Sequence, residues 1–147
     1  MSLLIALGAC SDTPGKDPVL AQLDELTANA ADCGSFIGYT GQPNPSCHTA
    51  SAQPAVDCLN AAIANGTKAT YVIASADSQL FEEDMVFVVV DGTVRTFIEH
   101  PGGDRSTDQP YATEEGGGCT TPAFTVASNV CPFDVNMMES HASLTGC

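Results

Sequence analysis

Apolar residues recur at helical spacing near the start of the chain, directly after an aspartate and a proline. Asp17 before Pro18 is typical of a helix start, because aspartate caps free amide groups and proline fits the first turn. The apolar stripe that follows consists of Val19, Leu20, Leu23, Leu26 and Ala30. Gly34 suits the left-handed position that ends a helix, so the pattern predicts a helix from Pro18 to Cys33.

A second helix is predicted from Pro54 to Asn65, where Gly66 ends it. Its inner side carries Val56, Leu59, Ala62 and Ile63, with Cys58 beside them. Residues 35–50 hold several glycines and prolines and are predicted to form a loop that Cys47 pins. Residues 67–74 then alternate in the manner of a strand.

A hairpin is the clearest local pattern in the chain. Residues 85–90 and 93–98 are rich in β-branched and aromatic residues, and Asp91-Gly92 between them fits a tight turn that needs positive φ twice. The turn predicts pairs that share one face: Val89–Val94, Phe87–Thr96 and Met85–Ile98. The opposite face carries Val86, Val88, Val90, Thr93, Arg95 and Phe97. Because this second face is also largely apolar, the sheet is either covered on both sides or meets a partner, and we favour burial in the core.

The chain continues with a long loop, a strand and a tail. Residues 99–118 are rich in glycine and proline and are predicted as a loop, of a length that is usually functional or mobile. A last strand is predicted over about 123–127, followed by a tail held through Cys131 and Cys147. Helices followed by strands predict an α+β fold: two N-terminal helices packed on one face of a mostly antiparallel sheet of about four strands, held by disulfides.

Seven cysteines are present, and six of them are predicted to form disulfides. These six are Cys33, Cys47, Cys58, Cys119, Cys131 and Cys147. Consecutive members are 14, 11, 61, 12 and 16 positions apart, whereas metal sites normally show close pairs such as Cys-x2-Cys. We expect Cys33 to bond Cys58 and to tie the two helices together, and the sequence leaves the other pairings open.

The chain opens with an apolar run, Leu3-Leu4-Ile5-Ala6-Leu7-Gly8-Ala9, that ends at Cys10. Its last part, Leu7-Gly8-Ala9-Cys10, resembles the lipobox of bacterial lipoproteins, in which a signal peptidase cleaves before the cysteine and the cysteine receives a lipid. The resemblance implies that residues 1–9 are the remnant of a signal peptide, that residues 10–17 are the lipidation site and tether, and that residues 18–147 form a single domain. It implies a location in the bacterial cell envelope, periplasmic or on the outer surface, with secretion as the alternative. A docked apolar helix or strand is the other interpretation of the run, which is too short to cross a bilayer, since about 20 apolar residues are needed.

Acidic residues greatly outnumber basic ones. Eighteen Asp and Glu residues against Lys16, Lys68, Arg95 and Arg105 give a net charge of −14. Nucleic acid is excluded as a partner, because binding to phosphate backbones needs clustered Lys and Arg. The same charge repels anionic lipid, so we expect contact with a membrane through the lipid anchor only.

The residues able to support catalysis are scattered. His48, His100 and His141 lie in separate polar segments and no Gly-x-Ser-x-Gly motif is present, so no catalytic residue is assigned. One metal site is a candidate, a Ca²⁺ site in the long loop, because hard oxygen ligands on a flexible segment suit this ion. Its ligands would be Asp104, Asp108, Glu114 and Glu115. The Asp-x-Asp-x-Asp-Gly spacing is absent, so a solvated loop and a chain without cofactors is the alternative.

These patterns favour a non-enzymatic envelope protein, lipid-anchored or secreted, that binds another protein or a small ligand. The binding surface would be the sheet face or the loop of residues 99–118. Two alternatives are a secreted hydrolase that uses carboxylates or Ca²⁺, and a secreted module resembling protease inhibitors in its disulfides and exposed loop.

Overall fold

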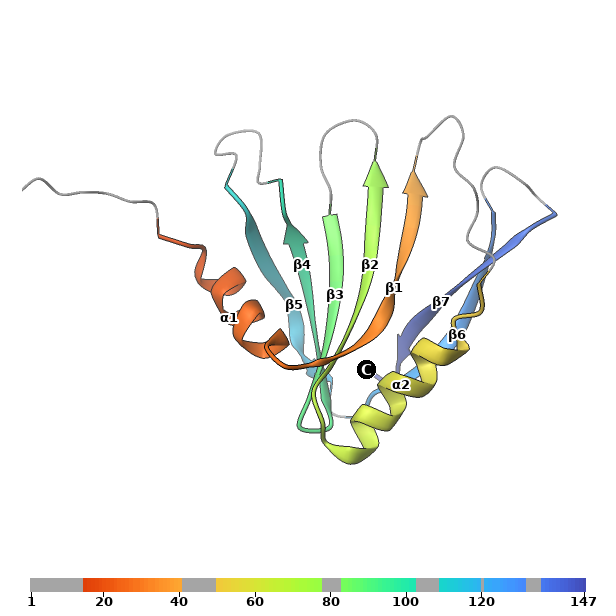
Figure 1. The fold of residues 1–147 in the computed structure, drawn as a ribbon, viewed down its shortest axis with the longest axis horizontal. Helices are drawn as coiled ribbons and strands as arrows, with labels where there is room; N and C mark the ends of the chain where they lie inside the picture. Colours follow the sequence, from red (N-terminus) through yellow and green to blue (C-terminus); the bar gives the residue numbers. More distant parts are fainter. Residues whose placement is uncertain (1–14, 41–49, 78–82, 103–108, 120, 132–135) are drawn as a thin grey trace, which may run out of the picture.

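The computed structural model describes residues 15–40, 50–77, 83–102, 109–119, 121–131 and 136–147 (Figure 1). Two helices and seven strands follow one another along these parts of the chain. They are α1 (Pro18–Thr27), β1 (Ala31–Thr40), α2 (Gln53–Asn65), β2 (Ala69–Asp77), β3 (Glu83–Val90), β4 (Thr93–His100), β5 (Tyr111–Cys119), β6 (Ala123–Val130) and β7 (Met138–Thr145).

The strands form two sheets. A five-stranded sheet has the order β1-β2-β3-β4-β5, and β6 pairs with β7 in a separate two-stranded sheet. β1 and β2 are parallel, with α2 in the connection between them, and every other pair is antiparallel. The predicted α+β class with a mostly antiparallel sheet is confirmed, although the described strands outnumber the four expected.

The predicted hairpin is confirmed in its register. β3 and β4 pair Val89 with Val94 and Phe87 with Thr96, as the Asp-Gly turn requires. Asp91 and Gly92 have φ values of 50° and 75°, the positive values that a tight turn of this kind needs.

The five-stranded sheet is covered on both faces, as the apolar character of both hairpin faces predicts. On one face, α1 packs through Leu20 and Leu23 against Val86, Val88 and Phe97. On the other face, α2 and the β6–β7 hairpin cover the sheet. The buried cluster there includes Val56, Leu59, Tyr71, Phe87, Val89, Val94, Phe124 and Ala142. The expectation that both helices lie on one face is therefore wrong, because each helix fills one of two apolar faces.

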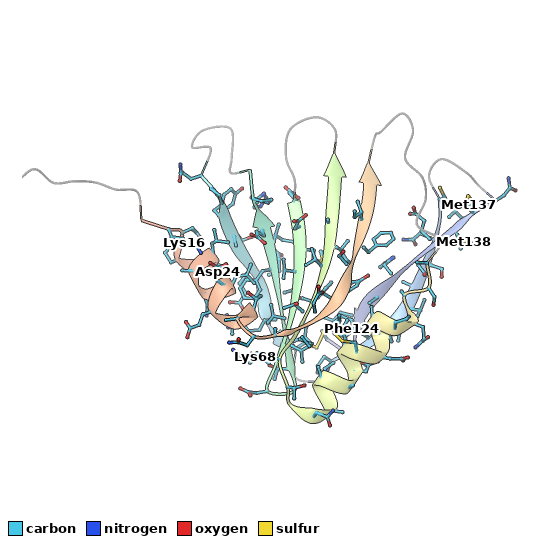
Figure 2. The ribbon with its side chains drawn as sticks, viewed as in Figure 1. Lys16, Asp24, Lys68, Phe124, Met137 and Met138 are labelled. Atoms are coloured by element: carbon cyan, nitrogen blue, oxygen red, sulfur yellow. A yellow bond between two sulfur atoms is a disulfide. The ribbon has the colours of Figure 1, made fainter. Side chains whose placement is uncertain are left out.

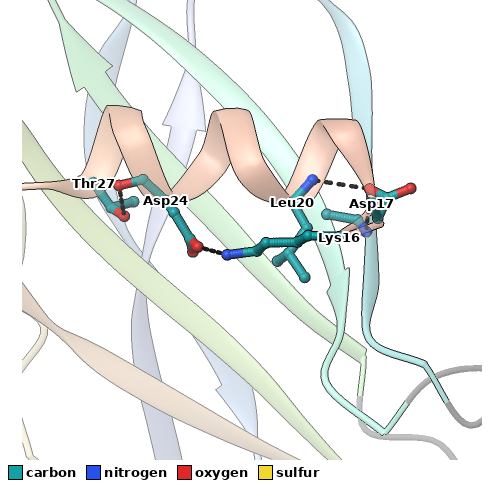
Figure 3. A network of polar contacts seen from close by, with 6 residues as sticks. Lys16, Asp17, Leu20, Asp24 and Thr27 are labelled. Atoms are coloured by element: carbon teal, nitrogen blue, oxygen red, sulfur yellow. Dashed lines mark hydrogen bonds and ion pairs between the residues drawn. The ribbon is translucent and has the colours of Figure 1, made fainter. Parts of the chain in front are cut away.

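α1 is capped and positioned by Asp17. The Asp17 Oδ1 atom accepts hydrogen bonds from the amides of Leu20, at 2.9 Å, and of Ala112 in β5, at 3.4 Å. Lys16 pairs with Asp24 along the exposed side of the helix (Figure 3). The aspartate thus starts the helix, as predicted, and also fixes it to the edge strand β5.

The first helix ends earlier than predicted. α1 stops at Thr27, Asn29 takes a φ of 61°, and β1 begins at Ala31. Asparagine tolerates this left-handed conformation better than most residues, which allows the chain to leave the helix before Gly34. Cys33 and Gly34 therefore lie in β1, and residues 35–40, predicted as a loop, continue this strand beside β2. Cys47 lies outside the described residues.

The predicted loop of residues 99–118 is also largely wrong. Glu99 and His100 complete β4, and residues 111–119 form β5. The register between β4 and β5 shifts between Val94 and Thr96, opposite the glycine run, and Gly116 has a φ of 68°. An edge strand tolerates such a bulge, since only one side of it carries a ladder of hydrogen bonds.

Disulfides hold the layers together. Cys33 is bonded to Cys58, as predicted, but the bond joins β1 to α2 rather than two helices. A second bond joins Cys119 to Cys147, and Cys131 is bonded to a partner outside the described residues. Such bonds persist in oxidising compartments, so they indicate a location outside the cytoplasm. Among the residues described, no helix has the length and apolar character needed to span a bilayer.

Candidate binding pocket

A pocket of about 210 Å³ lies where β1, the first turn of α2, β2 and β7 meet. Its walls come from elements that are distant in the sequence. The lining residues are Cys33, Gly34, Ser35, Phe36, Ala50, Ser51, Ala52, Pro54, Ala55, Tyr71 and Ser140. Among the residues that the structure describes, no charged side chain belongs to this lining, although the chain as a whole is strongly acidic.

Ser140 ties β7 to the start of α2. Its Oγ atom accepts a hydrogen bond from the amide of Ala52 at 3.0 Å and donates one to the carbonyl of Ala50 at 2.9 Å. Ala52 is the residue before α2 and has no side chain able to cap the helix. Ser140 therefore holds the residue before the helix through a contact across 88 positions of sequence, while the first helical amide, that of Gln53, donates to Ser51 Oγ at 3.2 Å.

Tyr71 connects β2 to β7, two residues beyond Ser140. Its hydroxyl oxygen accepts a hydrogen bond from the amide of Ala142 at 3.2 Å. Burial raises the pKa of Tyr71, against the opposite effect of this hydrogen bond, so the phenol stays protonated. The neutral hydroxyl keeps a proton that it can donate.

Phe36 and His141 form the aromatic part of the same region. Their ring centroids lie 5.2 Å apart, with the ring planes tilted by 39°. The Nδ1 atom of His141 is buried and has no hydrogen-bond partner among the described residues. Phe36, which lines the pocket, is thus in ring contact with a side chain of β7.

The other two histidines do not join this group. His48 lies outside the described residues. His100, at the end of β4, stacks on Tyr111 of β5, with ring centroids 4.2 Å apart and planes 13° apart. His100 and His141 therefore belong to different sheets.

The predicted Ca²⁺ ligands are only partly described. Asp104 and Asp108 lie outside the described residues. Glu114 and Glu115 are adjacent in β5, so their side chains point to opposite faces of the sheet. The calcium site stays a prediction; within the described part of the chain, no group of three or more His, Cys, Asp or Glu residues is placed to hold a metal ion.

Glu114 already has a strong partner. Its two carboxylate oxygens accept hydrogen bonds from Arg95 Nε and an Arg95 terminal nitrogen, each at 2.6 Å. These hydrogen bonds lower the pKa of Glu114 below its usual value. The Arg95 guanidinium also lies over the ring of Phe97, 5.2 Å from its centroid. A cation at Glu114 would therefore compete with a bidentate arginine.

One pair of acids lies side by side on the α1 face. Asp84 and Glu99 are directly opposite each other in β3 and β4. Burial raises the pKa of Glu99, the charge of Asp84 raises it further, and Lys16 acts in the opposite direction. Folding therefore favours the protonated form of Glu99. This pair is on the opposite face of the sheet from the pocket, so these two acids do not line it.

Sequence patterns did not identify the pocket. Phe36 falls in a segment predicted as a loop, and Ser140 in the tail predicted to be held through Cys131 and Cys147. Only Tyr71 and the start of α2 lie in elements that the pattern predicts. Comparison with protein-family models, with curated proteins and with solved structures found no match, so a function has to be inferred from this geometry.

Proposed function

We propose that this chain is a non-enzymatic binding module of the cell envelope, lipid-anchored or secreted, whose pocket takes a small uncharged group. The observation that carries the proposal is the pocket itself: its described walls are aromatic and alanine side chains with a few hydroxyl groups and no charged side chain, in a chain of net charge −14. An ionic ligand would find no counter-charge among these walls. A neutral, mainly apolar group would bury its surface there.

The size of the pocket limits the group that fits. A dry cavity of about 150 Å³ is large enough for benzene. The volume of about 210 Å³ therefore suits a group of one or two rings, or a branched aliphatic chain, rather than a large ligand. Tyr71 and Ser140 supply hydroxyl groups that suit one polar atom on such a group.

The walls are held in place before any ligand arrives. The Cys33–Cys58 bond fixes β1 against α2, and Ser140 fixes β7 to the start of the same helix. A site whose walls are already ordered loses little conformational entropy on binding. This rigidity favours a binding role for the pocket over its being only a space left by imperfect packing.

Mass spectrometry of the mature protein from its native host tests the envelope location. We expect a chain that begins at Cys10 and carries a lipid there, because Leu7-Gly8-Ala9-Cys10 resembles a lipobox. We also expect the other six cysteines to be oxidised, with Cys131 bonded to Cys47. An unmodified chain that still begins at Met1 would overturn the anchor, and free thiols would overturn the location.

Filling the pocket tests the binding role. Ala55 lines the pocket from α2, so Ala55→Leu is expected to weaken the binding of indole at least about tenfold, a loss of about 1.4 kcal/mol. Two-dimensional NMR titration of the purified protein with indole gives the affinity and locates the shifted amides. Benzoate, a charged ring of similar size, is expected to cause no saturable shift.

Ala61→Leu is the matched control. Ala61 lies on the exposed side of the same helix, and leucine preserves helix propensity at both positions. Indole affinity is expected to match that of the unmodified chain in this variant. An absence of saturable shifts with indole, or equal affinities in both variants, would contradict the assignment of the pocket.

A further inference from the structure

Among the described residues, nothing pairs with the outer edge of β6 along half of its length. The Asn60 side chain binds Phe124 at both backbone groups: its Nδ2 donates to the Phe124 carbonyl and its Oδ1 accepts from the Phe124 amide, each at 2.9 Å. The backbone groups of Phe124 therefore point away from β7. In an antiparallel strand every second residue points the same way, so Val126, Ser128 and Val130 present their amides and carbonyls to the same edge.

This edge has no described partner beyond Asn60. β6 pairs only with β7 in the described part of the chain, and α2 covers the edge at Phe124. From Val126 to Val130 the strand is exposed, apart from the half-buried Ala127. Unpaired strand edges of this kind are templates for pairing with another strand.

Three apolar side chains of the β6–β7 hairpin are exposed near this edge. Val126 is 39% exposed, Val130 is 54% exposed, and Met138, which pairs with Val130, is 53% exposed. These three positions share one face of the hairpin, with Ser128 between the two valines. Figure 2 shows Met137 and Met138 at the end of the hairpin away from the five-stranded sheet, and Phe124 toward α2.

The charge pattern indicates what pairs there. β6 has no charged residue, and the acid of β7, Glu139, is buried. Edges that must stay unpaired usually carry a charge or a proline, and this edge has neither. A basic partner would gain nothing from an uncharged edge, whereas a second acidic chain is repelled least at this position.

We infer that β6 pairs with β6 of a second copy of this chain, antiparallel across a two-fold axis. Centring the pair on Ser128 places Val126 opposite Val130 of the other copy, with the free amides and carbonyls of both strands matched. The two hairpins then form one four-stranded sheet, with valines in contact across the new pair. This inference does not rest on the function proposed for the pocket.

Sedimentation velocity over a series of protein concentrations tests the pairing. The unmodified chain is expected to shift from one to two chain masses as concentration rises, and non-reducing gel electrophoresis excludes a covalent dimer through Cys10. Ser128→Pro removes an amide that points outward and takes no part in the ladder with β7, so this variant is expected to stay monomeric. Ser128→Ala keeps the amide and is expected to dimerise like the unmodified chain.

Val130→Lys gives a second, independent test in case proline disturbs the hairpin. A lysine at the edge opposes pairing, although it lowers the net negative charge, so loss of the dimer would not reflect general repulsion. Circular dichroism and thermal unfolding establish that each variant folds. An unmodified chain that is monomeric at every concentration would overturn the inference, as would folded Ser128→Pro and Val130→Lys variants that still dimerise.

Discussion

Replacing Cys33 and Cys58 together by alanine is expected to lower the free energy of unfolding by about 3 to 4 kcal/mol. The bond closes a segment of 25 positions, and a loop of that length restricts the unfolded chain by about this amount. The same change releases β1 from α2 at the wall of the pocket. Urea unfolding followed by circular dichroism measures the first effect, and indole titration measures the second.

The Cys119–Cys147 bond provides the matched control. It closes a segment of 28 positions, so removing it is expected to cost about the same stability. It lies away from the pocket lining, so indole affinity is expected to be unchanged in the double alanine variant of this pair. Equal losses of indole affinity in the two variants would show that the pocket depends on overall stability rather than on the fixed β1–α2 contact.

Local signals in the sequence were sufficient for α2 and for the β3–β4 hairpin. The helix has an apolar stripe and ends at Gly66, whose φ is 63°, and the hairpin register follows from the turn between Val90 and Thr93. Each of these elements is decided by residues close together in the chain. Sequence patterns therefore predicted them almost to the residue.

β1 and β5 were not predicted because their stability comes from distant partners. Residues 35–40 contain glycine, yet their backbone groups pair with β2 some thirty-seven positions later, from Phe36–Ile73 to Thr40–Asp77. The glycines of β5 are accommodated by a bulge beside β4. In both strands, pairing with a neighbour outweighs a weak local preference.

The candidate pocket depends on the same kind of long-range contact. Ser140 meets Ala52 across 88 positions, and Tyr71 meets Ala142 across 71. A single serine in a polar tail carries no periodic signal that indicates such a role. The disulfide between Cys33 and Cys58 was the one long-range contact at the wall that the sequence indicated, because both cysteines fall beside apolar stripes.

Phe97→Ala is expected to lower the free energy of unfolding by about 3 to 5 kcal/mol, the range found for buried phenylalanines. Phe97 is fully buried (0% exposed) and is the largest side chain between α1 and the sheet. α1 has only ten residues, too few to be stable without this packing. Urea unfolding gives the change in stability, and hydrogen exchange of the α1 amides shows whether the helix opens first.

Phe97→Leu separates volume from the aromatic ring. Leucine keeps most of the buried surface, so the loss is expected to stay below about 1.5 kcal/mol, even though the contact of Arg95 with the ring disappears. Leu23 lies in the same cluster, so Leu23→Ala combined with Phe97→Ala is expected to cost less than the sum of the two single changes. A loss below about 1 kcal/mol for Phe97→Ala would mean that α1 does not cover this face, and the sheet would then present an open apolar surface in place of a second core.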